Sequence, residues 1–181
     1  MNTFQALFET YSRSTDTDIS EHLTTLRRYA DVCEHVTEMG VRHGISTVAF
    51  LSSAAKAVVS YDIREEPEVA MLRELCRQAE RDWVFHLEDS RQCTIAETDL
   101  LFIDTYHYYE HLRTELDRHG ASARKFIVMH DTEIYKYRST EDRDDQRGLM
   151  TAIEEFLTSN PEWFMLEHFT NQYGLTILQR S

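Results

Sequence analysis

Short apolar runs alternate along the chain with longer stretches in which apolar residues recur every three or four positions. Runs of strand length occur at 35–40, 57–62, 83–89, 99–104 and 125–131. Stretches with helical spacing occur at 46–55, 67–80, 109–120 and 147–159. Several of the apolar runs are continuous, which is typical of strands buried on both faces of a sheet. Strands that alternate with helices in this way predict an α/β fold with a mostly parallel sheet.

The two ends of the chain depart from this alternation. Residues 3–13 and about 20–33 each predict a helix before the first strand. Near the other end, strands at 163–170 and 173–179 are separated only by Asn171-Gln172, which predicts an antiparallel hairpin. Because no repeat or linker divides the sequence, we expect residues 1–181 to form a single domain.

One stretch has no regular pattern. Residues 136–147 are polar and mostly charged, and they follow the predicted strand that ends in His130 and Asp131. This stretch is interpreted equally well as a solvated acidic loop or as a lid over a site.

Composition narrows the classes of function. Hydrophobic residues make up 41% of the 181 residues and charged residues 28%, which is ordinary for a globular protein. The formal net charge of -13, without a cluster of Lys or Arg, argues against a nucleic-acid substrate. The three cysteines, Cys33, Cys76 and Cys93, form no C-x-x-C pair, and no apolar run has membrane-spanning length. We therefore expect a cytoplasmic protein that neither enters a membrane nor relies on disulfides.

A glycine-containing turn follows the first predicted strand. Glu38, Gly40 and Gly44 lie where that strand passes into a helix, and glycines there let a ligand approach the backbone closely. The turn is not the dinucleotide-binding G-x-G-x-x-G, because Arg42 occupies the position of the middle glycine. Taken alone, the pattern indicates a tight strand-to-helix turn as readily as a ligand site. Asp62 ends the next strand 22 positions after Gly40, near the spacing at which a carboxylate meets a ribose hydroxyl.

Acidic residues also end the later strands of the predicted sheet. Asp89, Asp104 and Asp131 each come directly at or after an apolar run, and His107 and His130 lie beside two of them. Because ligands of open α/β sheets bind outside the carboxyl ends of the strands, we expect these side chains to converge on one crevice.

Five segments of the chain, taken in order, resemble a known family. They are VTEMGVRHGISTVAFL, DLLFIDTYHYYEHLRTEL, RKFIVMHDTE, GLMTAIEEFL and FTNQYGLTILQR. The chain resembles the class I S-adenosylmethionine-dependent methyltransferases, and most of all their compact cephalosporin-hydroxylase-like or macrocin-type O-methyltransferases. The resemblance implies a Rossmann-like, mostly parallel seven-stranded sheet with helices on both faces and the hairpin at its edge. Residues 35–181 would form this core, and residues 1–34 a helical cover over the cofactor.

The resemblance also implies roles for the strand-end residues. Glu38, Gly40 and Gly44 would hold the methionine part of S-adenosylmethionine, Asp62 its ribose, and Asp89 would border the adenine. In metal-dependent members, an acid ends the fourth strand, a basic residue follows three positions later, and further polar residues end the fifth.

Four residues of this chain occupy the comparable metal-site positions. Asp104, His130 and Asp131 would bind Mg²⁺ or Mn²⁺. His107 would be the general base, and Asp104 would be the second catalytic residue. The chain departs from the catechol-type pattern, because His107 replaces a lysine and His-Asp-Thr replaces Asp-Asn, and an imidazole makes a site less selective for magnesium.

Other interpretations of the same residues are open. Asp104 could cap the helix that begins near Tyr108, and His107 and His130 could be hydrogen-bonded core histidines. The protein as a whole could be a catalytically silent binding module with the methyltransferase fold. A metal-dependent hydrolase is disfavoured, because the chain has neither a nucleophile elbow nor a phosphate-binding loop. The expected partner is a small-molecule or sugar acceptor; the oligomeric state is open, with a homodimer as one option.

Overall fold

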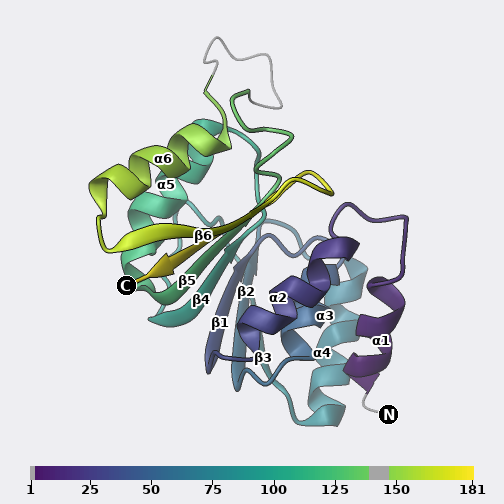
Figure 1. The fold of residues 1–181 in the computed structure, drawn as a ribbon. Coiled ribbons are helices and arrows are strands. Elements are labelled where there is room, and N and C mark those ends of the chain that lie inside the picture. Colours follow the sequence, from purple (N-terminus) through teal and green to yellow (C-terminus); the bar gives the residue numbers. More distant parts are fainter. Residues whose placement is uncertain (1–2, 139–146) are drawn as a thin grey trace.

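The computed structural model describes residues 3–138 and 147–181. Its centre is a seven-stranded sheet with the order β3-β2-β1-β4-β5-β7-β6 (Figure 1). The strands are β1 (His35–Met39), β2 (Ala57–Asp62), β3 (Asp82–Leu87), β4 (Thr98–Ile103), β5 (Ala123–His130), β6 (Trp163–Phe169) and β7 (Leu175–Arg180). The first five strands pair in parallel, whereas β7 is antiparallel to both β5 and β6. The predicted mostly parallel sheet with a terminal antiparallel hairpin is therefore confirmed.

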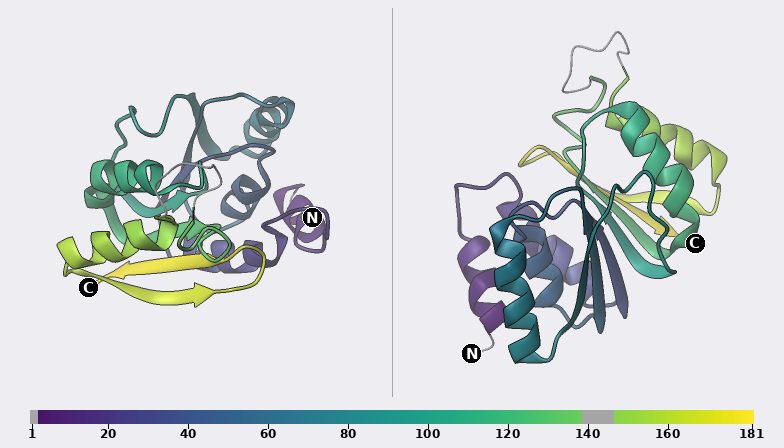
Figure 2. Two further views of the ribbon diagram at one scale, coloured as in Figure 1. Left: turned by 90° about the horizontal axis from the view of Figure 1, so that it is seen from above. Right: turned by 180° about the vertical axis from the view of Figure 1, so that it is seen from behind.

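Helices cover both faces of this sheet, as the two further views in Figure 2 show. They are α1 (Thr3–Tyr11), α2 (Leu23–Ala30), α3 (Ile45–Leu51), α4 (Pro67–Ala79), α5 (Tyr109–His119) and α6 (Leu149–Ser159), with short 3-10 turns at Ser20–His22 and Gly120–Ser122. Side chains of α1 to α4 form one hydrophobic cluster with the sheet, and those of α5 and α6 form another. Leu100 and Phe102 of β4 belong to the first cluster, and Leu101 and Ile103 to the second. Successive residues of the central strand thus fill two cores.

The predicted elements differ from the observed ones mainly at their ends. The helix expected at 20–33 is a 3-10 turn followed by α2, and the helix expected at 46–55 ends at Leu51. Pro67 is the first residue of α4, where a missing N–H costs least. None of the described helices has both the length and the hydrophobicity that crossing a membrane requires.

A fully buried carboxylate joins the sheet to α3. Glu38 of β1 has no exposed surface, and it accepts hydrogen bonds from Ser46 Oγ at 2.6 Å, Thr47 Oγ1 at 2.8 Å and Ser60 Oγ at 2.6 Å. The indole of Trp83 on β3 in turn donates to Ser60 Oγ at 2.9 Å. Burial raises the pKa of Glu38 to about 7, although the three hydroxyl donors favour the ionised form. The network connects β1, β2, β3 and α3 beneath the glycine turn.

Replacement of this acid should change how stability depends on pH. Because the pKa of Glu38 rises from 4.5 to about 7 on folding, the folded protein retains a proton that the unfolded chain releases. The free energy of unfolding should then fall by up to about 3 kcal/mol as the pH rises through this window, and Glu38→Gln should lack this contribution. Urea unfolding of both proteins between pH 5 and 8 measures the difference. Parallel pH profiles for the two proteins would contradict the expectation.

Candidate active site

A pocket of about 470 Å³ opens at the carboxyl ends of β1 to β4. This is the place where open α/β sheets bind ligands, and the volume lies in the range of small-molecule sites. Of the residues expected to bind a cofactor, Gly40, Asp62 and Asp89 line the pocket, whereas Glu38 and Gly44 do not. Asp104 also lines it. No residue of the described part of 1–34 lines this pocket, and α1 and α2 pack into the core on one face of the sheet.

The glycine turn at the end of β1 contains three residues with left-handed backbone, Gly40, Arg42 (φ 47°) and Gly44. Gly40 has φ 88° and Gly44 has φ 72°, and Gly44 is the N-cap of α3. A Cβ atom at Gly40 would overlap the backbone carbonyl of Asp104, while one at Gly44 would meet the end of the Leu72 side chain. Gly40 is therefore required for the approach of the turn to the end of β4.

Asp62 anchors the same turn. Its Oδ2 accepts hydrogen bonds from the backbone N–H groups of Val41 at 2.7 Å and Arg42 at 2.9 Å, and its Oδ1 accepts that of Arg64 at 3.0 Å. A carboxylate has about four lone-pair positions, so hydroxyl groups of a ligand can still donate to it. Asp62 thus both shapes the turn and presents charge to the pocket.

Asp89 is paired within its own loop. Arg91 donates to both of its carboxylate oxygens, at 3.1 and 2.7 Å. These hydrogen bonds hold the pKa of Asp89 at about 2. The side chain lies at the pocket wall with its charge balanced by that arginine.

Three ligand-type side chains converge beside the pocket. Ligand atoms of Asp104, His107 and Asp131 all lie within 4.8 Å of one another. His107 Nε2 lies 2.7 Å from Asp131 Oδ2, and its ring stacks on Tyr135 with 4.7 Å between centroids. Asp131 has φ 61°, a left-handed conformation that aspartate tolerates better than most residues. We call these three residues the acid cluster, and their donor atoms suit a divalent cation.

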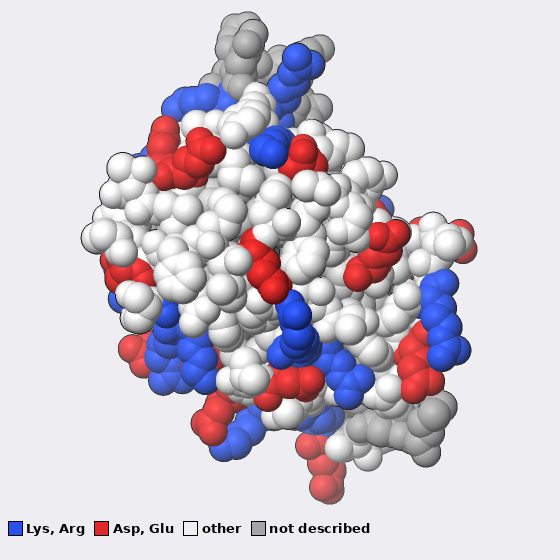
Figure 3. Space-filling view, viewed as in Figure 1, with Lys and Arg blue, Asp and Glu red and all other residues white. Residues whose placement is uncertain are grey.

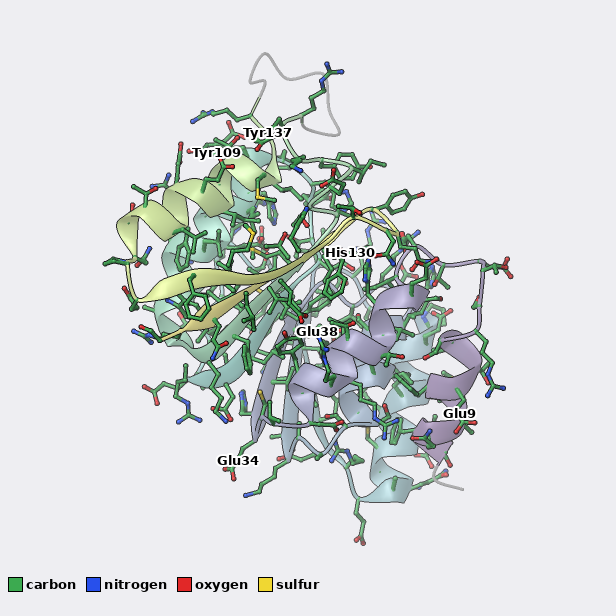
Figure 4. The ribbon with its side chains drawn as sticks, in the orientation of Figure 1. Glu9, Glu34, Glu38, Tyr109, His130 and Tyr137 are labelled. Atoms are coloured by element: carbon green, nitrogen blue, oxygen red, sulfur yellow. The ribbon has the colours of Figure 1, made fainter. Side chains whose placement is uncertain are left out.

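His130 lies beneath the acid cluster. Its Nδ1 is 3.5 Å from Asp104 Oδ1 and 3.3 Å from Asp131 Oδ2, and its Nε2 donates to the Gln172 carbonyl at 3.1 Å. Burial alone would lower the pKa of His130, but the charges and hydrogen bonds of the two acids raise it to about 10. Burial likewise opposes ionisation of Asp131, but hydrogen bonds from His107 and His130 hold its pKa well below the ordinary value. Figure 4 labels His130 inside the molecule, near the β6–β7 turn.

The geometry separates the alternatives for these residues. The N-cap of α5 is Tyr108 and no side chain caps it, so the interpretation of Asp104 as a helix cap is wrong. His107 has 31% of its side chain exposed and is not a core histidine. His130, with 1% exposed and hydrogen-bonded on both nitrogens, does match a core histidine, and His107 rather than His130 contributes the imidazole of the acid cluster.

Some of the pocket wall was not predicted from the sequence. Ser90, Thr105 and His111 line the pocket, and Glu115 lies behind them. His111, Glu115 and His119 are polar residues at four-residue spacing on the buried side of α5, and this spacing was the available signal. The stretch 136–147, interpreted as a loop or a lid, lies mostly outside the described residues, since these omit 139–146.

Charge on the molecular surface is mixed. The face in Figure 3 has a central area of mostly uncharged residues, and acidic and basic side chains are interspersed around it. No continuous basic area is visible on that face among the residues drawn in colour.

Three solved structures resemble the whole fold. One, described as a caffeoyl-CoA O-methyltransferase from Staphylococcus aureus, is 13% identical with a TM-score of 0.69, over 100% of this chain and 93% of that one. The second is magnesium protoporphyrin IX methyltransferase from Synechocystis PCC 6803 with bound S-adenosylmethionine (14% identity; TM-score 0.65; 99% and 93% covered). The third is an O-methyltransferase from Bacillus cereus in complex with S-adenosylhomocysteine (14% identity; TM-score 0.60; 100% and 91% covered).

The fold is that of the S-adenosylmethionine-dependent methyltransferases. In sequence, no family model and no curated protein matches the chain. Identities of 13% and 14% establish the fold. The pocket and the acid cluster lie at the carboxyl ends of the strands, where open α/β sheets bind ligands.

The glycine turn of this methyltransferase fold can be tested by paired substitutions. Gly40→Ala and Gly44→Ala impose similar strain from positive φ, but only the Cβ at Gly40 would meet backbone atoms. We expect Gly40→Ala to lower the free energy of unfolding by about 3 kcal/mol or more, and Gly44→Ala by about 1–2 kcal/mol, because Leu72 can move. Chemical denaturation of the two variants and the wild type measures both. Equal losses would show that the contact with Asp104 is unimportant.

Proposed function

We propose that the protein is an S-adenosylmethionine-dependent methyltransferase that methylates a hydroxyl group of a small-molecule or sugar acceptor with the help of a divalent cation. The observation that carries the proposal is the position of Asp104, which lines the pocket and also belongs to the acid cluster. A cofactor in the pocket and an acceptor at the cluster would therefore meet at this residue. In-line methyl transfer needs such alignment more than covalent help from the protein.

The cofactor would occupy the pocket along the ends of β1 to β3. The turn at Gly40 lets the backbone approach the methionine part, and Asp62 offers a carboxylate to the ribose hydroxyls. The loop that begins at Asp89 would border the adenine. Glu38 and Gly44 would act indirectly, by holding the turn and α3 from behind.

The cation would be held by the carboxylates of Asp104 and Asp131, the two acids of the acid cluster. Carboxylate oxygens suit Mg²⁺ or Mn²⁺, although the neighbouring imidazoles of His107 and His130 lessen the preference for magnesium. When bound, such a cation lowers the pKa of an acceptor hydroxyl and orients it.

His107 is the proposed general base. It is partly exposed beside the pocket, and Asp131 and Tyr135 fix its ring from two sides. An imidazole in this position can accept the proton of the acceptor hydroxyl as the methyl group is transferred.

The alternative, a catalytically silent module, is less favoured. A silent module would not need two acids and two imidazoles in contact beside the pocket. Burying Asp131 and His130 is unfavourable unless hydrogen bonds compensate for the lost water. Structural neighbours named for O-methylation and for bound S-adenosylmethionine support the enzyme assignment.

Binding of S-adenosylhomocysteine tests the proposal. We expect the wild type to bind S-adenosylhomocysteine with a Kd below about 1 mM. Asp62→Asn should weaken binding by about 1–3 kcal/mol, roughly 5- to 150-fold, because a charge-assisted hydrogen bond is lost. Isothermal titration calorimetry gives both values. The matched control is Asp82→Asn, because Asp82 is an exposed acid at the amino end of β3. Folded wild type that binds no S-adenosylhomocysteine would overturn the function.

Metal dependence is a separate expectation. Mn²⁺ should bind to the wild type, and Asp104→Asn should weaken binding by about tenfold or more because one carboxylate ligand is lost. Calorimetry with Mn²⁺, with circular dichroism to verify folding, measures the change, and Asp82→Asn again serves as control. Unchanged Mn²⁺ affinity in Asp104→Asn would exclude the acid cluster as the metal site.

A further inference from the structure

Helix α5, which packs with α6 on one face of the sheet (Figure 1), buries an acid and an imidazole. His111 and Glu115 have 3% and 0% exposed side chains, and His111 Nε2 lies 3.1 Å from Glu115 Oε1. The rest of the buried face is largely apolar, with Leu112 and Leu116 in the same core. Burying a carboxylate is unfavourable unless hydrogen bonds compensate for the lost water. The donors to Glu115 therefore indicate what this residue does.

Those donors come from two separate loops. Ser90 Oγ, in the loop between β3 and β4, donates to Glu115 Oε1 at 2.5 Å. Thr105 Oγ1, in the loop between β4 and α5, lies 2.9 and 3.0 Å from the two carboxylate oxygens. One carboxylate thus joins both loops to α5.

Further contacts support the same loops. His119 Nε2, one turn along α5, donates to the Ser90 carbonyl at 2.6 Å. His111 Nδ1 lies 3.3 Å from the Tyr108 hydroxyl, and the Tyr106 ring packs edge-on against His111 with 5.3 Å between centroids. Each of these partners lies in one of the two loops or on α5.

The loops that Glu115 joins form one wall of the pocket. Ser90, Thr105, Tyr106 and His111 all line it, whereas Glu115 lies directly behind. Thr105 also follows Asp104 in the chain, so the same hydrogen bond restrains the backbone next to the acid cluster. An apolar side chain of similar size could fill the space that Glu115 occupies, but it could not bond either hydroxyl.

We propose that Glu115, supported by His111, is a positioning residue that holds these two loops at the spacing that admits the purine base of the cofactor. The inference rests on the proposed function for the identity of the ligand. Its structural part, the restraint of the loops at 88–93 and 104–108 by a buried carboxylate, is independent of any ligand. Loosening the wall should weaken nucleoside binding without removing any group that touches the ligand.

The experiment compares Glu115→Met, Glu115→Gln and the wild type in two measurements. Amide hydrogen exchange of ligand-free protein reports on peptides that cover 88–93 and 104–108, and calorimetry gives the Kd for S-adenosylhomocysteine. We expect Glu115→Met to speed exchange in both loops about tenfold and to raise the Kd about tenfold, with partial rescue in Glu115→Gln, which keeps one acceptor oxygen. Glu110→Gln makes the same chemical change on the exposed side of α5 and should behave like the wild type.

The outcomes separate the two proposals. Faster exchange with a raised Kd supports the inference, whereas wild-type exchange and affinity in folded Glu115→Met overturn it. If the wild type binds no S-adenosylhomocysteine but Glu115→Met still exchanges faster, the restraint of the loops is supported. The assigned role in cofactor binding is then overturned, along with the proposed function. Should Glu115→Met fail to fold, Ser90→Ala and Thr105→Val remove the donors singly, and wild-type exchange and affinity in both would overturn the inference.

Discussion

The backbone contact between the ends of β1 and β4 is the constraint on which the candidate site depends. Asp104 N–H donates to the Met39 carbonyl at 2.8 Å, and Gly40 N–H donates to the Tyr61 carbonyl at 2.9 Å, so three neighbouring strands end in register. No side chain fits between Gly40 and Asp104. The turn that forms one wall of the pocket and the first acid of the cluster are therefore fixed relative to each other by main-chain geometry, before any side chain is considered.

Charge at the site is balanced within a small volume. Asp131 contacts two imidazoles, and His130 contacts two carboxylates. The far nitrogen of His130 donates to the Gln172 carbonyl in the β6–β7 turn, and His22 lies 3.3 Å from the same oxygen and packs edge-on against His130. The cluster at the centre of the sheet is thus connected both to the terminal hairpin and to the segment that precedes α2.

The order and type of the elements could be predicted because the apolar periodicities are strong and each of the first five apolar runs ends in an acid or a glycine. The residues that line one edge were predictable for the same reason, since parallel strands bring their carboxyl ends together. Which atoms meet was not predictable. The inward position of Glu38 depends on hydroxyls from α3 and β2, and the buried position of His130 depends on the β6–β7 turn, whose Gln172 carbonyl it bonds.

The place of β7 in the sheet bears on how the chain can fold. β7 lies between β5 and β6, although it follows both in the sequence. Until it is in place, β5 has an unpaired edge and β6 has no neighbour in the sheet. During synthesis the parallel half can assemble first, while the edge of β5, with Ile127 and Val128, is open to incorrect pairing. Chaperone demand should therefore be concentrated in the interval between the emergence of β5 and the arrival of the strand that covers it.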